Sequence, residues 1–168
     1  MSNVKPLVQR LLAAVYAMVV CVSVEGSEVG TVWATATATR PLDNHRIVYR
    51  FIKEFAPNFD RSSWPERVIL VWRYKSTVGM PSTVERESMD RMEDLLSSHV
   101  EKSGLAVLAL VSTGENLREW TYYTKSEEEF VGKLNAALGR EQRFPIEVHI
   151  APDPQWSTYE AFRRGVKE

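Results

Sequence analysis

Few side chains in this sequence have the types and spacing that catalysis or metal binding requires. The best set lies near the C-terminus, where Glu147, His149 and Asp153 follow one another closely. Side chains two positions apart in a strand point to the same face, so Glu147 and His149 could share a ligand. A metal site needs a third ligand at a suitable position, and the spacing to Asp153 does not provide one. A metal-dependent or hydrolytic enzyme using these three residues is therefore the alternative interpretation, and ordinary polarity at a strand end is the main one.

Other catalytic patterns do not occur in the sequence. The other two histidines, His45 and His99, are far apart, and the only cysteine is Cys21. A single cysteine can form neither an intramolecular disulfide nor a cysteine cluster for a metal. No serine or cysteine lies in a nucleophile elbow, and no glycine-rich loop resembles a phosphate-binding loop. We therefore expect no catalytic residue, no metal and no cofactor.

Charged and aromatic residues predict a binding face more readily than an active site. An arginine beside aromatic rings can stack on a ligand or bind the carboxylate of a partner. The candidate binding residues are Arg118, Glu119, Trp120, Trp156 and Tyr159. The alternative is structural: Arg118 would form an arginine–glutamate pair that bridges strands beside core aromatics. Trp156 and Tyr159, on one face of the last predicted helix, would attach that helix to the domain.

Composition and charge restrict the class of protein. The chain has 168 residues, of which 44% are hydrophobic and 26% charged, with a formal net charge of −1. These values are typical of one globular domain of ordinary composition. Proteins that bind phosphate backbones usually have a basic face and a high pI, whereas the pI here is about 6.3. We therefore expect a protein partner or self-association, and no nucleic acid.

The first 26 residues resemble an export signal. Lys5 and Arg10 precede an apolar run of 14 residues, Leu11 to Val24. A charged start followed by roughly 7–15 apolar residues is typical of a secretory signal, and a membrane-spanning helix needs roughly 20. We expect a periplasmic or secreted protein without a membrane contact after processing. A packed N-terminal helix, or a start assigned too early in a cytoplasmic protein, is the alternative.

Residues 27–44 are predicted to be a linker, because they contain small, simple residues and then turn-forming ones around Pro41. A single domain is predicted for residues 45–168. Period-two alternation or β-branched composition predicts its strands at 46–55, 67–74, 105–111, 117–123 and 144–150.

Three helices are predicted from capping signals. Ser82 with Glu85, and Ser126 with Glu129, have the spacing of capping boxes, and Asp153-Pro154 predicts a short final helix. From Arg67 the order is strand, helix, strand, strand, helix, strand. This order predicts an α+β, ferredoxin-like split βαββαβ fold with a four-stranded antiparallel sheet, an extra N-terminal strand and a short C-terminal helix.

The run Leu105 to Val111 is apolar on both strand faces. Such a strand indicates that the sheet is covered on both sides. We expect the two predicted helices of the split βαββαβ unit on one side. The cover on the other side is the strand around Tyr49, the C-terminal helix or a second subunit.

Several short segments occur in the order found in a known family. They are Gly79-Met80-Pro81-Ser82, Met92-Glu93-Asp94, Thr113-Gly114, Arg118-Glu119-Trp120, Pro145-Ile146-Glu147, and Asp153-Pro154-Gln155-Trp156 with Tyr159. Over about residues 67–160 the chain resembles the bacterial domain-of-unknown-function family numbered 695. That family is similar in fold to the protein inhibitor of ribonuclease E. The resemblance implies a small, non-enzymatic binding or regulatory domain, by analogy of fold alone.

Overall fold

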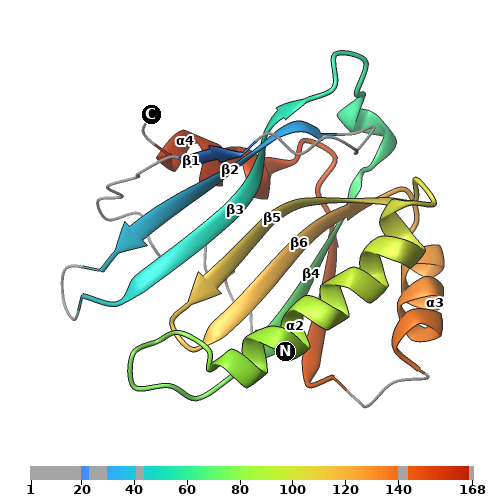
Figure 1. Ribbon diagram of the computed structural model, residues 1–168. Helices are drawn as coiled ribbons and strands as arrows, with labels where there is room; N and C mark the ends of the chain where they lie inside the picture. Colours follow the sequence, from blue (N-terminus) through green and yellow to red (C-terminus); the bar gives the residue numbers. More distant parts are fainter. Residues whose placement is uncertain (1–19, 23–29, 41–43, 140–143, 167–168) are drawn as a thin grey trace.

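The computed structural model describes residues 20–22, 30–40, 44–139 and 144–166. The described chain contains one antiparallel sheet with the strand order β1-β2-β3-β5-β6-β4-β7 (Figure 1). Six strands are long, and the first has only three residues. The strands are β1 (Val20–Val22), β2 (Gly30–Thr39), β3 (Arg46–Phe55), β4 (Glu66–Arg73), β5 (Ala106–Gly114), β6 (Leu117–Thr124) and β7 (Ile146–Pro152).

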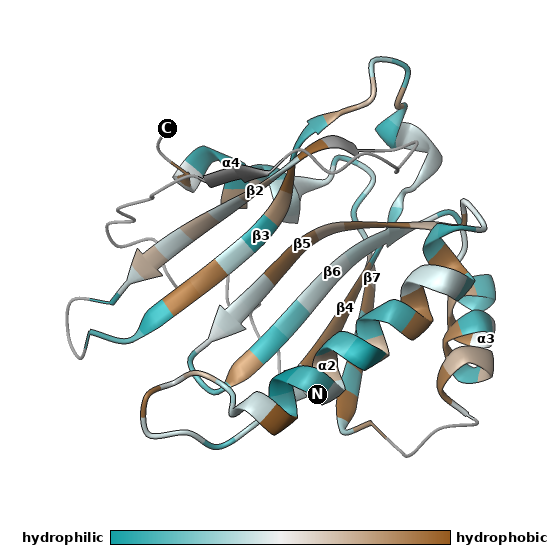
Figure 2. Cartoon of the chain, viewed as in Figure 1, coloured by the Kyte–Doolittle hydropathy of each residue, from teal (hydrophilic) through white to brown (hydrophobic). Residues whose placement is uncertain are grey.

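The helices lie on both sides of this sheet. They are η1 (Arg61–Ser63), α2 (Thr83–Leu96), η2 (Ser97–Glu101), α3 (Glu127–Leu138) and α4 (Ser157–Gly165). Side chains of α2, η2 and α3 pack with one set of strand residues, and those of α4 pack with the other set. We call these two sides of the sheet the α2 face and the α4 face. The long hydrophobic stretches of β4 and β5 lie between them (Figure 2).

The α+β class and the antiparallel sheet are confirmed, but the sheet is larger than four strands. Consecutive residues of β5 and β6 are buried, as expected for strands covered on both faces. The strand around Tyr49, β3, does not cover the second face; it extends the sheet by pairing with β5. The cover there is α4, whose Phe162 lies 4.9 Å from the Tyr49 ring and 5.0 Å from the Phe51 ring.

The linker predicted for residues 27–44 is wrong where the structure describes it, because residues 30–39 form β2. Alternation of alanine and threonine is simple in composition, but it suits a strand with two different faces. Ala34, Ala36 and Ala38 are buried on the α4 face, while Thr35 and Thr37 are half-buried on the other. The folded unit therefore begins before residue 45.

Most of the predicted export signal lies outside the described residues. Its residues Val20–Val22 form β1, which pairs with Trp33–Thr35 of β2. Within the described part of the chain, no helix has the length and apolarity needed to cross a membrane.

The last helix begins later than predicted. Asp153 to Trp156 form a turn, closed by a 2.9 Å hydrogen bond from the Trp156 N–H to the Asp153 carbonyl, and α4 starts at Ser157. Trp156 has a φ of 53°, in the left-handed region, which prevents the helix from extending backward through Pro154. Pro154 therefore lies in a turn before the helix, and not at its first position.

Candidate functional site

The five candidate binding residues lie on both faces of the sheet. Side chains alternate along β6, so Arg118 and Trp120 point to the α2 face and Glu119 to the α4 face. Trp156 and Tyr159 also belong to the α4 face. All five are buried, with exposed fractions between 0% and 8%. They therefore do not form one continuous surface.

On the α2 face, Arg118 is held by two carboxylates of α2. Its guanidinium lies 2.8 Å from Asp90 and 3.1 Å from Glu93. The indole N–H of Trp120 donates to the same Glu93 at 2.7 Å, and the Arg118 guanidinium lies 4.9 Å from the Trp120 ring centroid. The structural alternative predicted from the sequence was an Arg–Glu pair between strands; the carboxylates come from the helix α2 instead. It fixes α2 over β6.

Glu93 has a further partner that the sequence reasoning missed. Arg50 of β3 forms an ion pair with Glu93, and its guanidinium lies 5.4 Å from the ring centroid of Trp33. Its side chain keeps 43% of its surface exposed, against 9% for Arg118. The sequence signal for Arg50 was the alternation in residues 46–55. It puts the Arg50 side chain on the other face of the strand from the core residues Tyr49 and Phe51. The pairing of β3 with β5 brings Arg50 to Glu93, and the sequence alone does not show this pairing.

Arg50 lies in a part of the α2 face that the helices cover little. Among the described hydrophobic side chains of β2 and β3, only Trp33 packs with the hydrophobic cluster of α2 and α3. In Figure 1, β2 and β3 extend beyond α2. We define the Arg50 face as the half-buried side chains that point outward from these two strands. They are Trp33, Thr35, Thr37, Val48 and Arg50.

Next to this face, the end of α2 widens into a π-helix, η2, which ends at Glu101. Burial, and secondarily the charge of Glu93, raise the pKa of Glu101 to about 7. Tyr122 is fully buried nearby, its hydroxyl has no hydrogen-bond partner among the described residues, and burial raises its pKa well above the usual value. Single π-turns in helices are frequent at functional sites. Glu101 can therefore gain or lose a proton near neutral pH beside the Arg50–Glu93 pair.

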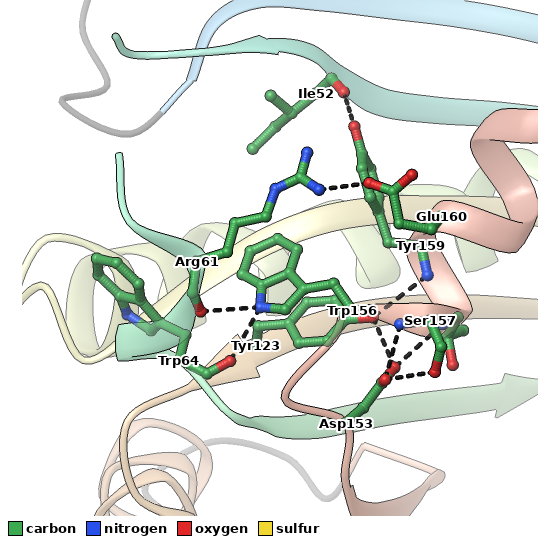
Figure 3. A network of polar contacts seen from close by, with 10 residues as sticks. Ile52, Arg61, Trp64, Tyr123, Asp153, Trp156, Ser157, Tyr159 and Glu160 are labelled. Atoms are coloured by element: carbon green, nitrogen blue, oxygen red, sulfur yellow. Dashed lines mark hydrogen bonds and ion pairs between the residues drawn. The ribbon is translucent and has the colours of Figure 1, made fainter. Parts of the chain in front are cut away.

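On the α4 face, Trp156 is the centre of a packed network (Figure 3). Its ring stacks on Tyr123 at 3.8 Å, and its indole N–H donates to the carbonyls of Arg61 at 3.2 Å and Trp64 at 3.0 Å. The Tyr159 hydroxyl donates to the Ile52 carbonyl, so α4 is also attached to β3. Trp156 is fully buried and its one polar atom is used internally.

Asp153 joins the same network. One of its oxygens accepts the Ser157 backbone N–H at 2.7 Å; the other accepts the Thr158 N–H at 3.1 Å and the Tyr123 hydroxyl at 3.0 Å. Burial alone would raise the pKa of Asp153, but the donors at Ser157 and Thr158 outweigh it and lower the pKa. Asp153 thus caps α4 as predicted, from the first position of the turn that precedes the helix.

The possible metal set is only partly assembled. His149 lies 3.4 Å from Glu147, which also accepts from Arg73 Nε at 2.7 Å. Both oxygens of Asp153 are used at the cap. The other histidines are elsewhere: His45 lies 3.5 Å from Glu115, and His99 contacts the Leu95 carbonyl at 2.8 Å. Within the described ranges, no three His, Cys, Asp or Glu side chains are grouped to hold a metal ion.

Comparison with known proteins assigns the chain to a family. It belongs to the family of unknown function DUF695, whose model matches residues 32–162. This match covers most of β2 and ends within α4, and it confirms the resemblance found in the sequence. No curated protein and no solved structure was found to match the chain.

Proposed function

We propose that this member of the DUF695 family is a non-enzymatic binding domain, and that it binds an extended, acidic protein segment on the Arg50 face. The proposal rests on the exposure and the contacts of the Arg50 side chain. Its guanidinium is nearly half exposed, lies over the Trp33 ring, and shares Glu93 with the more buried Arg118. Arginine can bind a carboxylate through two parallel hydrogen bonds. Packing of the guanidinium over an aromatic ring fixes its orientation for such binding.

The side chains around Arg50 suit a polypeptide ligand. Thr35 lies beside Arg50 across the β2–β3 pair, Thr37 beside Val48, and Thr39 beside Arg46. The threonine hydroxyls can both donate and accept hydrogen bonds, and Val48 gives a small apolar contact. Arg46 is exposed and makes no ion pair with any residue that the structure describes. Two arginines four residues apart on one strand would favour acidic side chains in the ligand.

The test is peptide selection from a random display library on the purified protein. We expect enrichment of peptides rich in Asp and Glu, and loss of their binding in Arg50→Gln. Arg73→Gln is the matched control, since Arg73 is also an exposed strand arginine, 45% exposed, paired with the single glutamate Glu147. It lies on β4, away from the Arg50 face, and should leave binding unchanged.

Two results would contradict the proposal. One is a selection that enriches no acidic peptides. The other is equal binding by wild type and Arg50→Gln, which would place the ligand elsewhere on the domain.

The alternative function, an enzyme using Glu147, His149 and Asp153, would have to act without Asp153 as a ligand or base. Both oxygens of Asp153 accept backbone N–H groups at the start of α4. Asp153 is therefore committed to holding α4 in place, so we favour binding.

Two further proposals concern the fold and the location of the protein. We propose that β4-α2-β5-β6-α3-β7 is a ferredoxin-like core, because its strands have the neighbour order β5-β6-β4-β7 with antiparallel pairs throughout. We also propose that the chain is exported, with β2 as the edge strand once the first 26 residues are removed. Intact mass of protein from the envelope or medium of its own host tests this, and full-length protein in the cytosol would contradict it.

A further inference from the structure

The strand β7 forms one edge of the described sheet, and its pairing with β4 is regular. It is the last strand on its side in the described chain and pairs with β4 at seven successive positions, Ile146 to Pro152, without a register shift. Edge strands of soluble proteins are usually short, bulged or protected by lysine and proline. Between Ile146 and Ala151, β7 contains neither lysine nor proline.

The opposite edge has the protection that β7 does not have. There the outermost described strand of the full chain is β1, of three residues, and removal of the first 26 residues would make β2 the outermost strand. The neighbouring pair β2–β3 contains two register irregularities, between Gly30 and Trp33. Pairing with another chain is therefore easier at β7 than at that edge.

The side chains of β7 differ between its two faces. Ile146 and Ile150 pack on the α2 face with the cluster of α2 and α3, and Val148 lies between them with 39% of its surface exposed. On the other face Glu147 and His149 are 47% and 42% exposed. An exposed valine thus lies at the centre of this edge strand, with an acid before it and a histidine after it. A second copy of the strand, running antiparallel, would place its histidine opposite this acid and its valine opposite this valine.

We propose that β7 pairs with β7 of a second copy of this chain, antiparallel and centred on Val148, to give one continuous sheet across a two-fold axis. In this register Val148 faces the partner's Val148, and Ile146 faces the partner's Ile150. Glu147 faces the partner's His149 on the other side of the sheet. Directly opposite residues are the pairs that stabilise antiparallel strands.

The polar side chains of β7 favour this register over its neighbours. Centring the pair on Glu147 would bring two carboxylates together at the axis, which is unfavourable. Centring it on His149 would put Glu147 opposite the partner's Ala151 and lose the complementary pair. The proposal concerns the edge of the sheet away from the Arg50 face, and it stands or fails independently of the proposed function.

Sedimentation measurements with charge variants test the proposal. Wild type should be a dimer at about 100 μM, a concentration that detects micromolar dissociation constants. Val148→Lys and Val148→Glu should each be monomeric, because like charges would meet at the axis. A mixture of the two variants should recover the dimer, because lysine then faces glutamate. Val84→Lys is the matched control: Val84 is an exposed valine of α2, 72% exposed, and this variant should stay dimeric.

A disulfide tests the register. In a Cys21→Ser background, Val148→Cys should form a covalent dimer on mild oxidation, because opposite residues in antiparallel strands lie about 4.5–5.5 Å apart between Cα atoms. Val84→Cys should not. A monomeric wild type, a Val148→Lys variant that remains dimeric, or a dimer that Val148→Cys cannot cross-link would each overturn the proposal.

Discussion

The indole ring of Trp156 lies parallel to the phenol ring of Tyr123, with 3.8 Å between the ring centroids and 5° between the planes. Trp156 belongs to the turn before α4, and Tyr123 belongs to β6 in the middle of the sheet. The stacked pair therefore joins the last helix to the centre of the domain. Phe55, Phe59 and Tyr159 surround Trp156 with edge-on ring contacts, so the position is a packing site.

Truncation of Trp156 should destabilise the domain strongly. Replacing a buried tryptophan by alanine typically costs about 3–5 kcal/mol in the free energy of unfolding. For a domain of this size, Trp156→Ala should lower the melting temperature by about 10 °C. The adjacent and exposed Gln155→Ala is the control and should melt like wild type. A melt of Trp156→Ala equal to that of wild type would mean that this residue lines a recognition surface instead.

Asp153→Ala should also destabilise the fold, for two reasons. Loss of a helix cap costs about 1 kcal/mol, and leaving the buried Tyr123 hydroxyl without its acceptor costs about 1–3 kcal/mol more. The pKa of Asp153 is lowered in the folded state, so its stabilisation is complete above about pH 4 and is lost as the pH falls through the folded pKa. Denaturant unfolding at pH 7 and pH 3 should show a smaller difference between variant and wild type at pH 3. An equal difference at both values would contradict a role for the carboxylate charge.

The two carboxylates that hold Arg118 should differ in importance. Glu93 is 15% exposed and binds Arg50, Arg118 and Trp120, whereas Asp90 is 55% exposed and binds only Arg118 among the residues that the structure describes. Removing one partner of a buried ion pair costs about 3–5 kcal/mol, and an exposed pair is worth about 0–1 kcal/mol. Glu93→Gln should therefore reduce the free energy of unfolding far more than Asp90→Asn. Equal losses from the two variants would show that the cluster does not depend on Glu93.

Glu101 should make the domain less stable as the pH rises. Its folded pKa of about 7 lies above the usual 4.5, so the folded state binds more protons than the unfolded state between these values. Stability contributed by the protonated form is present below about pH 4.5 and is lost as the pH rises through 7. Glu101→Gln should remove this dependence and raise the free energy of unfolding at pH 8 by about 2 kcal/mol, after allowing for partial contact with water. The same pH dependence in wild type and variant would show that another group is responsible.

Most of the fold could be predicted from local sequence patterns. The capping box of Ser82 and Glu85 is present at the start of α2, and the β-branched run after Arg67 forms β4. The errors came from long-range packing. The alanines of β2 are core residues only because α4 covers that face, and the turn at Trp156 depends on its stacking against Tyr123, 33 positions earlier in the chain.

The candidate site was less predictable than the fold. Trp156 and Arg118 were identified by residue type, but type does not show whether a side chain is exposed. Both are buried, and the Trp156 indole N–H and the two terminal guanidinium nitrogens of Arg118 have partners inside the domain. The sequence does not single out Arg50, because its partner, Glu93, is 43 residues away and only the pairing of β3 with β5 brings the two together.

The location of a bound acidic peptide tests the binding proposal most directly. Amide NMR shifts would be followed while a peptide from the display selection is titrated into the isotopically labelled protein. We predict that the largest changes occur at Thr35, Thr37, Val48 and Arg50, with little change along β7 or in the turn before α4. Largest changes around Trp156 and Tyr159, or along β7, would contradict the assignment of the Arg50 face as the binding surface.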